Sequence, residues 1–302
     1  MTSGIHSRVA WALGLVQAAL LLGCGPDRPA QPAAGPPAVP ALDGATVSPW
    51  QGMFAGVDYA SVQARSPRPM QIHVLRIDLA EPGVDFLVTP SNGEAPGETD
   101  SMTTGTFLKR HACQAAVNAS PYSPVVREEG KALDVDGLSV SRGQAYSAAS
   151  RQFAAILLTR DRKVRIAAPP VDAADAWNAV GGFGVLLKGG RNVAGPDSKL
   201  HPRTAAGVSA DGRFLYLLAI DGRQAGYSEG ATVGETADWL ARFGAHEALN
   251  LDGGGSTAMV VADGRGGVRV LNRPIDRGIP GTQRPVANHL GVLARPLTAP
   301  RR

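Results

Sequence analysis

One segment of the chain combines an acidic side chain with a run of glycines. In order, its residues are Asn250, Leu251, Asp252, Gly253, Gly254, Gly255, Ser256 and Thr257. The glycines let the backbone turn sharply and let a ligand approach its amides closely. Consecutive amides in such a loop can form an anion-binding nest. From these residues alone, a ligand site at Asp252 and a tight turn with a capping aspartate are equally good interpretations.

The elements on either side place this segment at the end of a strand. Residues 233–243 carry apolar side chains on one helical stripe, and Thr232 and Glu235 stand at capping-box spacing. Gly244 has the position of a glycine that ends a helix. Residues 248–251 then form an apolar strand that leads into the glycines. No lysine follows them, and a strand comes next rather than a helix, so the segment is not a P-loop.

Most of the remaining chain has the pattern of β-hairpins. The Asp-Gly pair at 211–212 is the strongest such signal, and further hairpins are expected around 81–83, 160–163 and 263–267. The other predicted helix covers 100–110. The predicted strands outside 248–251 are 72–79, 84–88, 112–117, 153–159, 164–167, 185–188, 205–209, 214–220, 258–262, 268–271 and 290–294. We therefore predict an α+β fold, in which helices flank a mixed, mostly antiparallel sheet.

Composition limits the classes of protein that the chain can belong to. Its 302 residues are 44% hydrophobic and 19% charged, which is ordinary for a globular protein and excludes wholesale disorder. The net charge is +4, but no Lys/Arg-rich run is present. We therefore expect no nucleic-acid partner.

The first residues have the pattern of a bacterial export signal. Arg8 precedes the apolar stretch 9–22, which is too short to span a bilayer stably. The stretch ends at Leu21-Leu22-Gly23-Cys24, which resembles the lipobox of lipoproteins, in which the cysteine is acylated. A plain cleaved signal and an uncleaved anchor are the alternatives. We expect lipidation at Cys24, with the folded domain anchored in the cell envelope and facing the periplasm or the exterior.

The domain boundaries follow from composition. We predict a signal peptide over 1–23, a linker rich in Pro, Ala and Gly over 24–48, one folded domain over 49–297 and a frayed tail over 298–302. The other cysteine, Cys113, stands among alanines and is expected to be a small buried residue. A disulfide between Cys24 and Cys113 is a less favoured alternative.

Several ordered motifs resemble those of the phosphodiester glycosidases. They are residues 203–212, Asp221-Gly222-Arg223, residues 230–235, residues 250–257 and residues 284–292. The resemblance is strong over 203–293 and looser over 70–202. In place of the Asn-Gly-Gly segment usual in the family, the chain has Asn118-Ala119-Ser120 before Pro121 and Tyr122. Residues 181–184 match another glycine-rich element only in outline. The altered segment puts the substrate in doubt, but not the fold.

This resemblance implies roles for three carboxylates. Breaking an anomeric C–O bond passes through an oxocarbenium-like transition state, which carboxylates stabilise. Asp252 is the first choice for the carboxylate at the anomeric centre, as nucleophile or as base for water. Glu235 and Asp221 compete for the second role. Glu235 is equally well explained as a helix cap, and Asp221 as part of an Asp-Gly turn.

The same resemblance assigns the binding residues. Arg203 and Arg284 are candidates for gripping phosphate, since a guanidinium binds it in a bidentate manner; surface ion pairs are the alternative. The other candidates contact sugar hydroxyls or phosphate: Asn118, Asn250, Asn288, Gly253, Gly254, Gly255, Ser256 and Thr257. His201, His246 and His289 are not at metal-ligand spacing. Asp252 with nearby carbonyls could hold Ca²⁺, but the oxygen pattern of a calcium loop is not present, so we expect no metal and no cofactor.

The predicted function is an exported hydrolase that cleaves a sugar from a sugar-1-phosphate diester or a related envelope glycan. Its expected partners are a sugar-phosphate or polysaccharide substrate and, through Cys24, a membrane. Two alternatives remain open. One is a non-catalytic polysaccharide-binding lipoprotein, and the other is a glycosidase that acts on ordinary O-glycosidic bonds.

Overall fold

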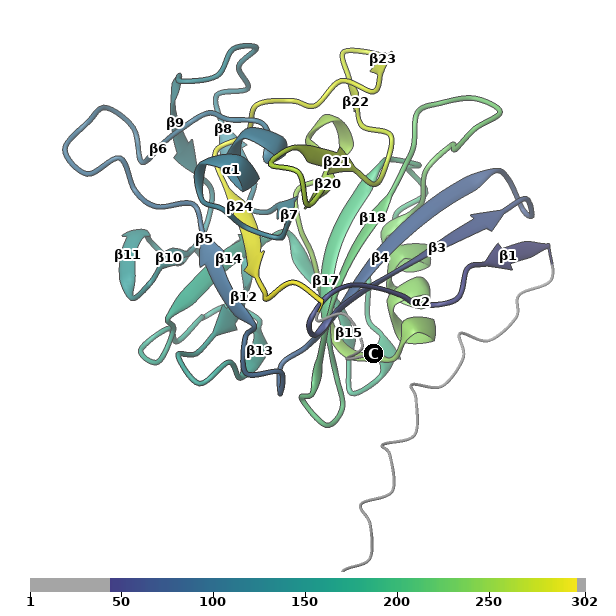
Figure 1. Ribbon diagram of the computed structural model, residues 1–302, viewed down its shortest axis with the longest axis horizontal. Coiled ribbons are helices and arrows are strands. Elements are labelled where there is room, and N and C mark those ends of the chain that lie inside the picture. Colours follow the sequence, from purple (N-terminus) through teal and green to yellow (C-terminus); the bar gives the residue numbers. More distant parts are fainter. Residues whose placement is uncertain (1–43, 298–302) are drawn as a thin grey trace, which may run out of the picture. The chain divides into compact units, whose positions relative to one another are not determined.

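The computed structural model describes residues 44–297 (Figure 1). The predicted signal peptide, Cys24, most of the linker and the tail lie outside these residues. The described part begins within the predicted linker, because strand β1 (Ala45–Val47) pairs with strand β3 (Val57–Ala64). The ordered sheet therefore starts a few residues earlier than the predicted boundary at residue 49.

The largest element is an antiparallel sheet of nine strands. Its main path runs β1-β3-β4-β18-β17-β19-β15-β16, and β2 pairs with β3. The strands not yet given are β2 (Gln51–Phe54), β4 (Met70–Asp78), β15 (Gly184–Lys188), β16 (Arg191–Asn192), β17 (Arg203–Ser209), β18 (Phe214–Ile220) and β19 (Ala245–Asn250).

Two five-stranded antiparallel sheets accompany it. The first has the order β21-β20-β7-β24-β5, from β21 (Val268–Val270), β20 (Met259–Ala262), β7 (Ala115–Asn118), β24 (His289–Leu293) and β5 (Asp85–Val88). The second has the order β11-β10-β14-β12-β13, from β11 (Gln144–Ser147), β10 (Ser139–Ser141), β14 (Asn178–Gly182), β12 (Ala154–Leu158) and β13 (Val164–Ala167). Shorter pairings join β6 (Thr99–Asp100), β8 (Tyr122–Ser123) and β9 (Ala132–Val135), and β22 (Ile275–Asp276) with β23 (Ile279–Pro280).

Alternating side chains give the nine-stranded sheet two apolar faces. In β18, Leu215 and Leu217 belong to a core cluster that also contains residues of the five-stranded sheets. Tyr216 and Leu218 belong to a second cluster, which includes the apolar side of helix α2 (Val233–Phe243). Successive strand residues point to opposite faces, so one face packs on other sheets and the opposite face packs on a helix.

This arrangement corrects the predicted fold class. The α+β prediction, with helices flanking the sheet, is wrong: the described residues are largely antiparallel β-structure and contain two α-helices, α2 and α1 (Thr104–Arg110). Only α2 covers the nine-stranded sheet, against which it is drawn in Figure 1. The other face is covered by strands, which bury it as well as helices would. No helix within residues 44–297 is long and apolar enough to cross a membrane.

The predicted local structure is confirmed at most hairpins. β12 pairs with β13, β17 with β18 and β20 with β21 across the expected turns. The hairpin around residues 81–83 is wrong, because β4 lies in the nine-stranded sheet and β5 pairs with β24 in a five-stranded sheet. Cys113 is buried, at 1% exposure, as predicted.

Candidate active site

The glycine-rich segment lies where the chain crosses from one sheet to another. β19 belongs to the nine-stranded sheet and β20 to a five-stranded sheet. Between them, the Asp252 amide donates to the Ala119 carbonyl and the Gly254 amide donates to the Pro202 carbonyl, both at 2.8 Å. A 3₁₀ turn, η1 (Gly254–Ser256), follows. These bonds hold the backbone of Asp252 at the junction of two sheets.

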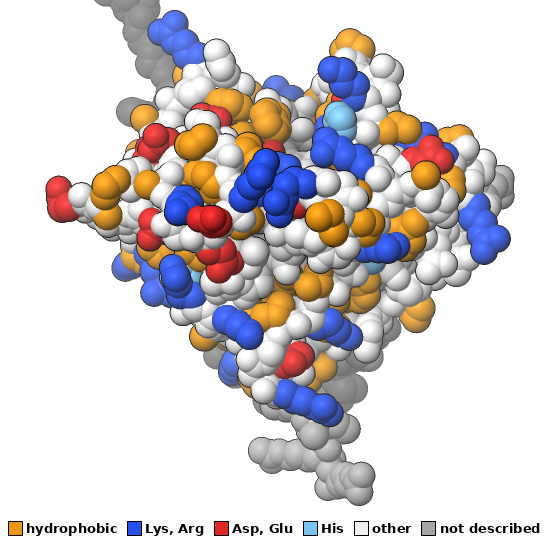
Figure 2. Space-filling model, turned by 90° about the horizontal axis from the view of Figure 1, so that it is seen from above, with side chains coloured by type: hydrophobic (Ala, Val, Ile, Leu, Met, Phe, Trp, Pro, Cys, Tyr) orange, Lys and Arg blue, Asp and Glu red, His pale blue; other side chains and the backbone are white. Residues whose placement is uncertain are grey.

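A pocket of about 330 Å³ opens beside this segment. Its lining includes Phe183, His201, Arg203, Arg223, Asn250 and Asp252. The η1 turn contacts β22, so the site lies at the end of Figure 1 where β22 and β23 are drawn. Figure 2 views the molecule from that end and shows Lys and Arg side chains gathered near the centre of the face. A pocket of this size suits one sugar unit with an anionic group.

Asp252 is the carboxyl group with the most perturbed environment. Burial raises its pKa from 3.8 to about 6, and the negative charge of Asp136 acts in the same direction. The Ser256 hydroxyl, the charge of Arg284 and the Gly253 amide favour the anion and limit the rise. A carboxyl group tuned in this way can take or give a proton near neutral pH.

Each glycine of the segment makes room for a neighbour. A Cβ on Gly253 would lie 2.7 Å from the Pro202 carbonyl oxygen. On Gly254 it would lie 2.9 Å from Nη2 of Arg223, and on Gly255 it would lie 2.2 Å from Nη2 of Arg284. Two of the three glycines therefore let a guanidinium group lie directly against the backbone next to Asp252.

Three side-chain oxygens of the segment are buried without a hydrogen-bond partner among the described residues. They are Asn250 Oδ1, Ser256 Oγ and Thr257 Oγ1. Ser256 lies near Asp252 and Tyr122 but makes no hydrogen bond of ordinary geometry. An unpaired buried polar atom costs about 1–3 kcal/mol, which a ligand hydroxyl or phosphate would offset.

Two of the predicted asparagines are used within the protein. Nδ2 of Asn118 donates to the Asp252 carbonyl at 2.6 Å, and its Oδ1 accepts from Thr204 and from the Ala258 amide. Asn288 is fully buried and bonds Ser120 and Tyr146. The structure thus places Asn118 and Asn288 as supports of the site, while Asn250 lines the pocket.

The two predicted arginines both have acidic partners. Nη2 of Arg203 lies 2.8 Å from Asp197, and its Nε donates to the Ala231 carbonyl. Nε of Arg284 lies 2.7 Å from Asp276, which leaves its terminal nitrogens beside Gly255. Arg284 is therefore oriented toward the segment, whereas Arg203 contributes to the pocket wall with much of its guanidinium engaged.

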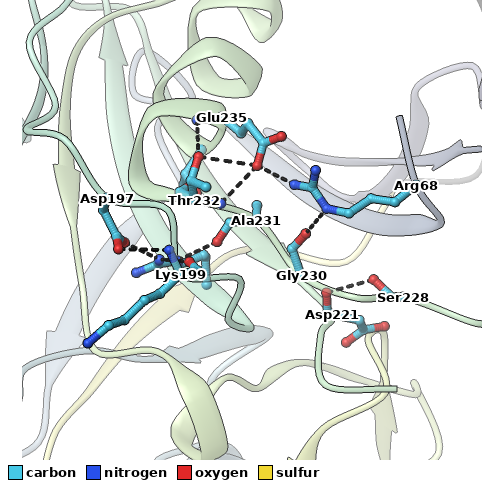
Figure 3. A network of polar contacts seen from close by, with 11 residues as sticks. Arg68, Asp197, Lys199, Asp221, Ser228, Gly230, Ala231, Thr232 and Glu235 are labelled. Carbon is cyan, nitrogen blue, oxygen red and sulfur yellow. Dashed lines mark hydrogen bonds and ion pairs between the residues drawn. The ribbon is translucent and has the colours of Figure 1, made fainter. Parts of the chain in front are cut away.

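Asp221 follows β18 at the same end of the sheet but does not line the pocket. It is 1% exposed, and its carboxylate accepts hydrogen bonds from Asn272, Tyr227 and the Arg273 amide. Its carbonyl accepts from Ser228, as Figure 3 shows. This environment fits a structural carboxylate that is saturated by protein donors.

Glu235 forms the predicted capping box. Its Oε2 accepts from the Thr232 amide at 2.9 Å, and its own amide donates to Thr232 Oγ1 at 3.1 Å. The carboxylate also pairs with Arg68 (Figure 3). Gly244 ends the helix in the left-handed conformation, at φ 109°. The helix-cap interpretation of Glu235 is confirmed, and the residue is absent from the lining of the pocket around Asp252.

The structure adds four residues that the sequence analysis did not assign to the site. Phe183, His201 and Arg223 line the pocket, and Asp136 is the carboxylate whose charge acts on Asp252. Asp136-Gly137 follows strand β9 just as Asp252-Gly253 follows β19. That repeated strand-Asp-Gly pattern is the sequence signal from which Asp136 could have been found.

No group of three or more His, Cys, Asp or Glu side chains within residues 44–297 could hold a metal ion. His289 is fully buried, and burial lowers its pKa to about 3, so its imidazole is neutral. The polar character of the site comes from Asp252, the arginines and the unpaired oxygens.

The fold and the site together define a class: an antiparallel β-protein with a sugar-sized pocket beside a carboxylate and guanidinium groups. Residues 111–293 match the family model of the phosphodiester glycosidases, and the chain belongs to that family. The resemblance seen in its motifs is thereby confirmed. No curated protein sequence matches the chain.

Solved structures with the same fold share little sequence with it. A hypothetical protein from Synechocystis is 18% identical, with a TM-score of 0.62, over 80% of this chain and 62% of its own. The chain thus spans less than two thirds of that protein. A Burkholderia pseudomallei protein with an ascribed exported location is 15% identical, with a TM-score of 0.62, over 88% of this chain and 100% of its own. The catalytic domain of zebrafish N-acetylglucosamine-1-phosphodiester α-N-acetylglucosaminidase, auto-inhibited by its pro-peptide, is 18% identical, with a TM-score of 0.56. The match covers 83% of this chain and 84% of the zebrafish chain.

Proposed function

We propose that this protein is a hydrolase that cleaves a sugar from a sugar-1-phosphate diester. The observation that carries the proposal is Asp252, a carboxyl group with a pKa of about 6 that lines a pocket next to hydroxyl and amide oxygens with no hydrogen-bond partner within residues 44–297. Membership of the phosphodiester glycosidase family supports the type of bond.

The chemistry needs an anionic carboxylate at the anomeric carbon. Asp252, as its anion, attacks that carbon or deprotonates a water that does so, and the C–O bond to the phosphate breaks. If Asp252 attacks directly, water then hydrolyses the resulting glycosyl ester and frees the carboxylate. Phosphate leaves readily as an anion, so charge stabilisation by Arg284 replaces much of the work of a general acid. Asp136 is a second carboxylate near the site, and its negative charge raises the pKa of Asp252.

The substrate that we propose to test first is an N-acetylglucosamine 1-phosphodiester, after the activity in the name of the zebrafish relative. The Ala119-Ser120 pair adds side chains next to the Asp252 amide, where the family has glycines. We expect this change to alter the choice of sugar or aglycone. A panel with several sugars is therefore needed.

The decisive experiment measures hydrolysis by the wild-type chain and by Asp252→Asn. The amide cannot act as nucleophile or base, so we expect kcat/KM to fall by about 1,000-fold or more. Asp161→Asn, which removes an exposed carboxylate from a surface ion pair, is the matched control and should keep full activity. Retained turnover in Asp252→Asn would disprove the role, and substrate binding without turnover in the wild type would identify a binding protein. The anomer released distinguishes attack by Asp252 from attack by water.

We further propose that the protein is exported and anchored through a lipid on Cys24. The sequence pattern before Cys24 supports this location. In a protein exported in this way, the pocket would lie outside the cytoplasm, where envelope glycans with phosphodiester links would be the available polymers.

A further inference from the structure

The pocket beside Asp252 contains a guanidinium group without a carboxylate partner. Arg223 makes no ion pair within residues 44–297, and its Nη2 lies 3.1 Å from Nδ1 of His201. Burial and the charges of Arg284 and Arg203 lower the pKa of Arg223, whereas Asp252 favours its cation. Arg203 and Arg284 have acidic partners in Asp197 and Asp276, so Arg223 is the arginine of this group whose charge is left for an anionic ligand.

The backbone of Arg223 is adapted to this position. Its φ of 58° is in the left-handed region, which non-glycine residues seldom adopt. The guanidinium rests on Gly254, where a Cβ would come within 2.9 Å of Nη2. The conformation brings the Arg223 cation against the loop, on the Gly254 side of Asp252.

The other side of Asp252 is aromatic. Phe183 lines the pocket with 49% of its surface exposed, and its amide donates to the Asn250 carbonyl at 2.8 Å. Phe153 supports its ring at a centroid distance of 5.9 Å. An exposed aromatic ring held in this way offers a flat apolar face to the C–H face of a sugar. Asn250, which also lines the pocket, has its side-chain Oδ1 buried without a hydrogen-bond partner among the described residues.

Asp252 lies between the aromatic and the cationic side chain along the loop. The Phe183 amide is hydrogen-bonded to Asn250, which precedes Asp252, and the Arg223 guanidinium packs against Gly254, which follows it. We propose that the pocket fixes the direction of its substrate, with the sugar ring against Phe183 and the phosphate against Arg223. This inference rests on the proposed function and specifies which wall binds which end. The anomeric bond, which joins the two ends, then lies at Asp252.

The test compares two substrates that share one sugar. They are N-acetylglucosamine 1-(methyl phosphate) and 4-nitrophenyl N-acetylglucosaminide, which lacks the phosphate. Arg223→Ala removes charge-assisted hydrogen bonds, so kcat/KM should fall about 10- to 100-fold on the phosphodiester and less than about threefold on the nitrophenyl glycoside. Phe183→Ala should lower both by the same factor, about three- to tenfold.

Matched controls separate these effects from general damage. Arg142→Ala removes an exposed arginine that has the same left-handed backbone, at φ 50°, outside the pocket. Val193→Ala removes an apolar side chain that is 48% exposed, close to the exposure of Phe183. Both variants should behave as wild type. Equal losses on the two substrates in Arg223→Ala, or a loss confined to the phosphodiester in Phe183→Ala, would overturn the assignment.

A binding measurement distinguishes failure of this inference from failure of the proposed function. If the wild type hydrolyses neither substrate, calorimetric titration with N-acetylglucosamine 1-(methyl phosphate) still reports its affinity. Weakened binding in both Arg223→Ala and Phe183→Ala, with unchanged binding in Arg142→Ala, would support the orientation in a protein that is not a hydrolase. Absence of binding to the wild type, or unchanged binding in both pocket variants, would overturn the orientation.

Discussion

A carboxyl group with a pKa of about 6 changes charge within the range in which many enzymes work. If the anion of Asp252 reacts, kcat/KM should rise with pH through about 6 and level off above it. The negative charge of Asp136 raises this pKa, so Asp136→Asn should move the midpoint to lower pH. Complete pH–rate profiles of both proteins check this. A rate that falls as pH rises through 6 would show that Asp252 acts as an acid instead.

The same pKa has a consequence for stability. The folded-state pKa of Asp252 is raised above its ordinary value of 3.8, so the folded protein binds more protons than the unfolded chain between these values. Stability contributed by the protonated group is therefore lost as pH rises from about 4 to about 6. Asp252→Asn should be more stable than wild type at pH 7.5 by about 1–2 kcal/mol, less than the full pKa shift implies, because the half-buried side chain lines an open pocket where solvent screens its charge.

Urea unfolding of both proteins at pH 7.5 and pH 4 measures this difference, which should largely disappear at the lower pH. An Asn variant that is less stable than wild type at pH 7.5 would contradict the stated cause. Greater stability combined with lost activity is the behaviour expected when a charge is buried for function.

At the scale of elements, we predict that Glu235 stabilises helix α2 and has no catalytic role. Glu235→Ala removes the reciprocal cap with Thr232 and the ion pair with Arg68. The expected cost is about 1–2 kcal/mol of folding stability, with kcat/KM within about threefold of wild type. Thermal unfolding and kinetics on one preparation give both values. A 100-fold loss of activity at unchanged stability would return Glu235 to the catalytic role.

The second prediction at this scale concerns Gly255 in the η1 turn. A methyl group at Gly255 would clash with the guanidinium of Arg284 and displace it. The backbone of Gly255 is not in the left-handed region, so an alanine there adds no backbone strain. Gly255→Ala should therefore reduce kcat/KM on a phosphodiester by about tenfold or more, at a small cost in stability. Gly195→Ala, where a Cβ meets nothing within 4 Å, is the control. Full activity of Gly255→Ala would show that Arg284 need not lie against the backbone.

Elements whose signals are local were predictable from the sequence. The cap and the left-handed glycine determine α2, and Asp211-Gly212 determines the turn between β17 and β18. Residues 81–83 also form a turn, but turn residues do not encode whether the next strand returns to the same sheet. For this reason β5 was assigned to the wrong partner.

The site was partly predictable for a related reason. Asp252 stands out because glycines follow it, and its catalytic role remains a prediction. Arg223 and Phe183 come from loops after other strands, and only the packing of the sheets brings them to Asp252. Conversely, Asn118 matches a motif but is occupied by backbone and Thr204 contacts. The type of a residue does not reveal whether its hydrogen bonds are already made within the protein.

At the scale of the whole molecule, we predict that a lipid is attached to Cys24 and not to Cys113. Cells grown with a fatty-acid analogue should label the wild-type chain and not Cys24→Ser. Cys113→Ser should keep the label, because burial of Cys113 raises its pKa to about 12 and keeps the thiol protonated and inaccessible. Unlabelled wild-type protein would disprove the anchor, and label lost only in Cys113→Ser would reverse the assignment.

The position of β24 has a consequence for how the chain is made. This strand is among the last described residues, yet it lies inside its sheet, between β7 and the edge strand β5. On the ribosome, β7 and β5 therefore lack the strand that joins them until residues 289–293 have been made. Such non-local pairing is slow to form. We expect the nascent chain to stay open to chaperones until β24 emerges and pairs, and a stop codon before residue 289 to leave an aggregation-prone fragment.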